Sequence, residues 1–121
     1  QEVSTLVIQA QSDLCEVRKM IHKIGFFIEK EKFCMDAGKP YLVMRAVRGE
    51  EKTPYEPAEY EYGRLLPEAG DAAYRSYLLD ERDKKMKLQE TLKMQKTSGA
   101  GARVEELTEE ITGLNWILNK F

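Results

Sequence analysis

The sequence lacks long apolar runs and is poor in histidine and cysteine. Its 121 residues include one histidine, two cysteines and one tryptophan. The densest apolar stretch, Ile24–Ile28, is interrupted by Gly25 and is far shorter than the roughly 20 residues that a membrane-spanning helix needs. No secretory signal is visible at the amino terminus. We therefore expect neither membrane insertion nor secretion.

The few residues that could carry chemistry are poorly spaced for it. Cys15 and His22 are seven residues apart, about 10 Å along a helix, which argues against a shared metal ion or a nucleophilic pair. Cys15 and Cys34 lie about 28 Å apart on one predicted helix, so reduced thiols are expected. A glycine-rich phosphate loop and a nucleophile elbow are also missing. These absences predict no enzymatic activity, no cofactor and no metal.

An excess of one charge is missing as well. The net charge is −2, although charged residues make up 33% of the sequence, against about 25% in a typical domain. Such a balance gives no global reason to bind nucleic acid or an anionic membrane. The high charge content fits long, solvated helices.

What the sequence does have is an apolar residue recurring in alternating steps of four and three. From Val3 to Ile28 this repeat predicts one long coiled-coil helix over residues 2–37, ended by Gly38 and Pro40. The repeat is already in step at the first residues, so we expect a fragment of a longer coiled coil. The β-branched core positions argue for three or more helices, or for an antiparallel pair. The predicted oligomer seam of this helix consists of Val3, Val7, Leu14, Val17, Ile21, Ile24 and Ile28.

Two further helices are predicted in the second half of the chain. Asp71 is a good N-cap for a helix over residues 71–97, and a Gly-rich break then leads to a third helix over residues 102–121. Its seam repeats the steps of three and four through Val104, Leu107, Ile111, Leu114 and Leu118. We expect both helices to return along the first and form a bundle.

The middle segment, residues 38–70, is extended, irregular or a small β element. Tyr41–Val47 favours a strand, and Glu59–Tyr62 alternates charged and aromatic residues. An antiparallel pair of these two runs and an irregular loop remain open alternatives. The predicted fold class is therefore mainly α: one domain, 1–121, with a long coiled-coil helix, a short irregular or β-hairpin segment and two returning helices.

Several aromatic and apolar residues lie away from the predicted seam. They form a candidate partner surface, although core packing is the stronger interpretation of the two leucines. The set comprises Phe26, Phe33, Tyr60, Tyr62, Leu65, Leu66 and Trp116. Its position predicts a protein partner in addition to a second copy of the chain.

The first functional hypothesis is a non-enzymatic oligomerisation and adaptor domain, of a cytoskeletal, kinetochore or trafficking kind. It predicts a dimer or larger homo-oligomer in the cytoplasm, with the nucleus as the alternative, and no small-molecule substrate. The second hypothesis is a domain that tethers a polyanionic filament or nucleic acid through a basic helix face. Nucleic acid is the less favoured partner, because a solvated helix face explains the same residues. That face comprises Lys84, Lys85, Lys87, Lys93 and Lys96.

Overall fold

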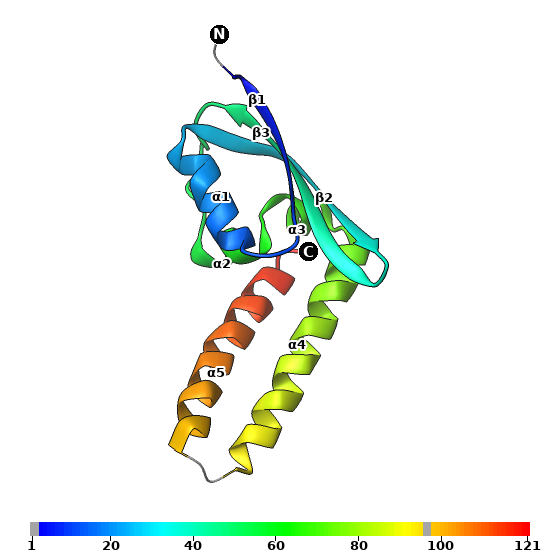
Figure 1. Cartoon of the computed structure of the whole chain (residues 1–121), viewed down its shortest axis with the longest axis vertical. Coiled ribbons are helices and arrows are strands. Elements are labelled where there is room, and N and C mark those ends of the chain that lie inside the picture. The colour runs from blue at the N-terminus through cyan, green and yellow to red at the C-terminus, as the bar shows by residue number, and fades with distance from the viewer. Residues whose placement is uncertain (1–2, 96–97) are drawn as a thin grey trace.

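The computed structural model describes residues 3–95 and 98–121. It contains a three-stranded sheet and five helices (Figure 1). The predicted, mainly α fold class is therefore wrong. The elements are β1 (Thr5–Ala10), α1 (Leu14–Lys23), β2 (Phe26–Asp36), β3 (Lys39–Arg48), α2 (Pro57–Tyr62), α3 (Leu65–Ala69), α4 (Ala72–Lys93) and α5 (Ser98–Leu118).

The sheet has the strand order β1-β3-β2, and β3 is antiparallel to both of its neighbours. Strands β1 and β2 therefore run parallel to each other, with β3 between them. Helix α1 connects them as a crossover along the sheet (Figure 1). This places the end of β1 and the beginning of α1 at the edge of the sheet that faces the helices α4 and α5.

The region predicted as one long helix is divided by two residues with positive φ. Asp13 (φ 56°) precedes α1, and Gly25 (φ 84°) separates α1 from β2. The run Thr5–Ala10 alternates exposed and partly buried side chains, as a half-buried strand does. Its β-branched residues favour a strand. The step of four from Val3 to Val7 is even, so it fits one face of an extended chain as well as a helix.

The predicted helix end at Gly38 is the turn of a β-hairpin. Ala37 (φ 51°) and Gly38 (φ 78°) join β2 to β3, and both have the positive φ that two-residue hairpin turns of type I′ require. Tyr41–Val47 lies in β3, but its partners are β1 and β2 and not Glu59–Tyr62. The latter run belongs to α2, which Glu56 and Glu59 cap reciprocally.

Helices α4 and α5 form an antiparallel hairpin that projects away from the sheet (Figure 1). Asp71 caps α4 by accepting a hydrogen bond of 2.8 Å from the backbone N–H of Tyr74. Further along, the side-chain amide of Gln89 donates to the hydroxyl of Thr108 on α5 at 2.6 Å. The ranges predicted for these helices were 71–97 and 102–121, of which residues 96 and 97 lie outside the described part of the chain. None of the helices in the described part is long and apolar enough to cross a membrane.

The core lies between the sheet and the bases of α4 and α5. It joins residues from both halves of the chain, so the helical hairpin is packed onto the sheet region and not tethered to it by a linker. Its buried members are Ile21, Phe26, Ile28, Leu42, Met44, Ala46, Tyr55, Leu66, Tyr74, Leu78, Leu114 and Ile117.

Candidate functional site

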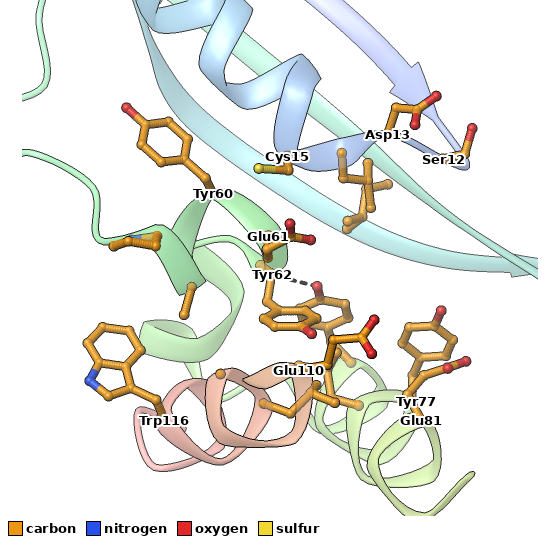
Figure 2. A pocket seen from close by; sticks show the side chains of 18 of the residues that line it. Ser12, Asp13, Cys15, Tyr60, Glu61, Tyr62, Tyr77, Glu81, Glu110 and Trp116 are labelled. Carbon is orange, nitrogen blue, oxygen red and sulfur yellow. Dashed lines mark hydrogen bonds between the residues drawn. The ribbon is translucent and has the colours of Figure 1, made fainter. Parts of the chain in front are cut away.

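A cleft of about 1220 Å³ opens where β1 ends and α1 begins (Figure 2). Its lining includes the connection Gln11–Asp13, α2, and the facing sides of α4 and α5. The cleft lies beside the carboxyl end of β1 and collects aromatic and charged side chains from α1, α2, α4 and α5. It is the candidate functional site of the chain.

Aromatic side chains form much of the wall of the cleft. Tyr60 and Tyr62 come from α2, Tyr77 from α4 and Trp116 from α5 (Figure 2). Aromatic walls offer flat surfaces on which a planar ring can stack. The cleft is therefore shaped for a ligand with an unsaturated ring.

Carboxylates are the second feature of the cleft. Glu61, Glu81 and Glu110 reach it from α2, α4 and α5 respectively (Figure 2). Burial raises the pKa of Tyr62, and the same three carboxylates raise it further. The Tyr62 hydroxyl thus remains a neutral hydrogen-bond donor at physiological pH, surrounded by negative charge.

Cys15 also lines the cleft, but it is not an activated thiol. Burial raises its pKa above the ordinary value of 9.0, and the neighbouring carboxylate of Glu61 raises it further. Nucleophilic cysteines need a lowered pKa. The side chain therefore contributes shape to the cleft and no covalent chemistry.

A buried polar network holds α2 in place beside the cleft. The Arg18 guanidinium donates to the carbonyl oxygens of Tyr60 and Glu61 at 2.8 and 2.9 Å. The Tyr74 hydroxyl donates to the next carbonyl oxygen, that of Tyr62, at 2.7 Å (Figure 2). Three successive carbonyl groups at the end of α2 are thereby satisfied, which fixes the backbone that carries Tyr60, Glu61 and Tyr62.

His22 lies behind the cleft wall and is not a ligand of a metal with Cys15. Its Nδ1 is 2.8 Å from the Tyr60 hydroxyl and its Nε2 is 3.2 Å from Glu51 Oε2. The ring also packs edge-on against Tyr55, with 4.7 Å between the ring centroids. Both ring nitrogens are therefore engaged, and Tyr60 offers the cleft its ring and not a free hydroxyl.

The structure disperses the residues of the predicted seam over several elements. Val3 and Val7 are exposed at the amino-terminal end, whereas Ile21, Ile28 and Leu107 are fully or almost fully buried inside the chain. They do not form one continuous helical stripe. The remaining members, Leu14, Val17, Ile24, Val104, Ile111, Leu114 and Leu118, lie on or next to α1 and on α5. Whether copies of the chain associate stays a prediction.

The candidate partner surface is also not one surface. Phe26 and Leu66 belong to the core, and Phe33 packs between Tyr74 and Tyr77 on α4. Leu65 packs against that core. Phe33, Tyr60, Tyr62 and Trp116 are the members that the structure brings to the cleft.

The lysines of α4 do not share one face. Nine residues separate Lys84 from Lys93, which places them on opposite sides of the helix, about 180° apart. Lys84 pairs with Asp80 at 3.2 Å, and Lys85 pairs with Glu110 at 3.5 Å beside the cleft. Lys87 and Lys93 are exposed, and Lys96 lies outside the described residues. The described lysines therefore do not all lie on one side of α4, and a role for the predicted set in binding stays a prediction.

Sequence reasoning missed the cleft because it treated β1, α1 and β2 as one helix. The signals that could have revealed it are the alternation in Thr5–Ala10, the polar residues Gln11–Asp13 and the helix-breaking Gly25. Together they are typical of a strand, a strand-to-helix connection and a second strand. The carboxylates Glu61, Glu81 and Glu110 carry no signal of their own.

Comparison with known proteins gives a family for this chain. Residues 1–115 match the family described as TrmK: tRNA (adenine(22)-N(1))-methyltransferase. A search of curated proteins gives no match.

Solved structures share the fold over almost the whole chain. An uncharacterised protein from Listeria monocytogenes superposes with a TM-score of 0.87 at 19% identity, covering 96% of this chain and 51% of that one. The B. subtilis M1A22 tRNA methyltransferase TrmK gives 0.79 at 18% identity, covering 94% and 51%. M. capricolum TrmK, in complex with S-adenosyl-homocysteine, gives 0.79 at 16% identity, covering 97% and 50%. This chain thus spans about half the length of the proteins it matches.

These matches overturn the functional predictions made from the sequence. A family of tRNA methyltransferases contradicts the non-enzymatic adaptor, the tethering domain, and the associated coiled-coil and cytoskeletal terms. It equally contradicts the expectations that the protein has no small-molecule substrate and does not favour nucleic acid. These predictions are wrong because they assign residues 2–37 to one long helix, and a chain folded in that way has no cleft. By its match over residues 1–115, the chain belongs to the TrmK family of tRNA (adenine(22)-N(1))-methyltransferases.

Proposed function

We propose that this chain forms part of an enzyme that methylates N1 of an adenosine in tRNA. The observation that carries the proposal is the family match across residues 1–115. The M. capricolum relative is described with S-adenosyl-homocysteine as its natural cofactor product, which supports S-adenosylmethionine as the methyl donor. We also place the reaction in the cytoplasm.

The described residues of this chain do not fit a cradle for that donor. Nucleotide-like cofactors bind at a glycine-rich turn from a strand into a helix. The turn from β1 into α1 is Gln11–Asp13 and contains no glycine, and Gly25 and Gly38 lie in other kinds of connection. The proposal therefore assigns to these residues the recognition of the base and not of the methyl donor.

The lining of the cleft supports a role for these residues in recognising the base. Enzymes that modify a base take it out of its stack and hold it between aromatic or apolar side chains. Tyr62, Tyr77 and Trp116 provide such surfaces around a volume large enough for a nucleoside. The network of Arg18 and Tyr74 fixes the backbone of α2, which orients Tyr62 before the base arrives.

The experiment that tests the proposal is methylation of a tRNA transcript, with S-adenosylmethionine, by the complete enzyme of which this chain is proposed to form part. Nucleoside mass spectrometry identifies the product, and a reverse-transcription stop reports its position. We expect 1-methyladenosine at position 22 and no product on a matched transcript with guanosine there. Absence of 1-methyladenosine from the first transcript, or equal methylation of both, would contradict the proposal.

A further inference from the structure

We infer that the cleft prefers a purine ring that carries a positive charge, such as N1-methylated adenine, over the neutral purine. The inference rests on the proposed function, because that function brings adenine to the cleft. The groups responsible are the carboxylates of Glu61, near Tyr62, and Glu81, near Tyr77 (Figure 2).

The chemistry of adenine makes this preference meaningful. Adenine is neutral at physiological pH, whereas alkylation of N1 leaves a positive charge delocalised over the ring and its exocyclic amine. Carboxylates nearby attract that charge, and more strongly where water is partly excluded. Aromatic faces attract it through their electron-rich π systems. A cleft with both features therefore favours the methylated ring over the unmethylated one.

Two carboxylates of the cleft, Glu61 and Glu81, have no direct ion-pair partner among the described residues, and the lining also contains Lys19 and Lys85. Glu110 is paired with both Lys85 and Arg103, at 3.5 and 3.3 Å. Within residues 3–95 and 98–121, by contrast, neither Glu61 nor Glu81 forms an ion pair. The two residues come from different helices and both contribute to the raised pKa of Tyr62, so their charge is felt at its ring.

The two carboxylates act on the groups that lie next to them. Glu81 raises the pKa of the Tyr77 hydroxyl, and Glu61 raises the pKa of the Cys15 thiol. All four side chains line the cleft, so the negative charge of Glu61 and Glu81 is located at its wall.

The aromatic wall of this cleft already takes part in one cation–π contact. The ammonium group of Lys120 lies over the Trp116 ring, 4.5 Å from its centroid, at the border of a smaller hollow. Trp116 also lines the main cleft.

The negative charge of Glu61 and Glu81 also disfavours the phosphate groups of the RNA backbone in the cleft. The base, and not the RNA backbone, is therefore the part that enters.

The test is isothermal titration calorimetry of the protein with 1-methyladenosine, adenosine and N6-methyladenosine. The first nucleoside is cationic and the other two are neutral, so the comparison separates charge from the added methyl group. We expect 1-methyladenosine to bind about tenfold more tightly than either neutral nucleoside. Equal affinities for the three would overturn the inference.

Two double variants test whether Glu61 and Glu81 cause the preference for the cationic purine. Glu61→Gln combined with Glu81→Gln keeps the shape of the cleft, removes both negative charges, and is expected to abolish the preference. The matched control, Glu90→Gln with Glu105→Gln, changes exposed glutamates on α4 and α5 away from the cleft lining and should retain it. A preference that survives in the first variant contradicts the assignment.

If the double variant does not fold, a measurement on the unmodified protein tests the inference. Raising the ionic strength should weaken binding of 1-methyladenosine and leave adenosine unaffected, since only the former is held by charge. An affinity for the cation that does not respond to salt would overturn the inference. The outcome is separate from that of the methylation assay: methyl transfer without a preference for the cation rejects only this inference.

Discussion

Arg18 on α1 and Glu31 on β2 form an ion pair of 2.7 Å whose two side chains have no exposed surface. Burial alone would lower the pKa of Arg18, but the carboxylate of Glu31 raises it above its ordinary value. The same guanidinium holds the end of α2. One buried charge pair thus connects the crossover helix, the sheet and the wall of the cleft.

Removing one partner of this pair should lower the unfolding free energy more than removing both. Arg18→Met leaves a buried carboxylate without a counter-charge, which costs about 3–5 kcal/mol of unfolding free energy. The double variant Arg18→Met, Glu31→Met removes the stranded charge and should recover part of that loss. Urea unfolding followed by circular dichroism measures the unfolding free energy of both variants. A double variant at least as unstable as Arg18→Met alone contradicts this interpretation.

Gly63 is predicted to be intolerant of a side chain. Its φ is +91°, and a Cβ there would lie 2.9 Å from Glu31 Oε2 and 3.0 Å from Arg18 Nη2. Gly63→Ala should therefore destabilise the protein by about 1–3 kcal/mol. Gly101→Ala is the matched control, because that glycine lies in α5 with open space around it and the change should stabilise by up to about 1 kcal/mol. Equal effects of the two substitutions on the thermal midpoint would refute the argument.

Cys15 reports on the charge of Glu61. With Glu61 ionised, the pKa of the Cys15 thiol lies above 9.0, so alkylation by iodoacetamide at pH 8 should be slow. Glu61→Gln removes one of the causes that raise this pKa. The rate of alkylation at pH 8 should then rise several-fold and its pH dependence should shift to lower pH. Peptide mass spectrometry distinguishes Cys15 from Cys34, which serves as the internal reference.

Glu59 should contribute to stability at neutral pH and lose that contribution in acid. Burial raises its pKa, but the hydrogen bond from Arg64 outweighs this and the net pKa lies below the ordinary 4.5. The stabilisation is therefore complete above 4.5 and declines as the pH falls through the lowered, folded-state value. Glu59→Gln should narrow the difference in unfolding free energy between pH 7 and pH 3. An unchanged difference would argue against the Glu59–Arg64 pair, 2.6 Å in the structure.

The helices in the second half of the chain are predictable from its sequence, whereas the elements of the first half are not. Around Asp71 and in the apolar steps from Val104 to Leu118, local signals for a helix agree with the helices of the structure. Between Val3 and Ile28 the same steps of three and four occur across a strand, a helix and a second strand. Even steps occupy one face of a strand, so this pattern could not separate the two structures.

The cleft depends on contacts between residues far apart in the sequence. Arg18 meets the carbonyl groups of Tyr60 and Glu61 only because β3 lies between β1 and β2 and brings α1 against α2. A periodic pattern within one segment of the sequence cannot predict this contact between distant residues. Tyr60, Tyr62 and Trp116 were singled out as aromatic residues, but their shared location was not predictable.

The central claim is that the strand-end cleft receives the adenosine that is methylated. The most direct measurement is the rate of methyl transfer to tRNA by the complete enzyme carrying Tyr62→Ala, compared with the unmodified enzyme and with the exposed control Met94→Ala, which lies outside the cleft lining, at saturating S-adenosylmethionine. Tyr62 contributes a central ring of the cleft, so its removal should lower kcat/KM for tRNA by at least about tenfold while circular dichroism stays unchanged. A folded Tyr62→Ala protein that methylates position 22 at the unmodified rate would contradict the claim.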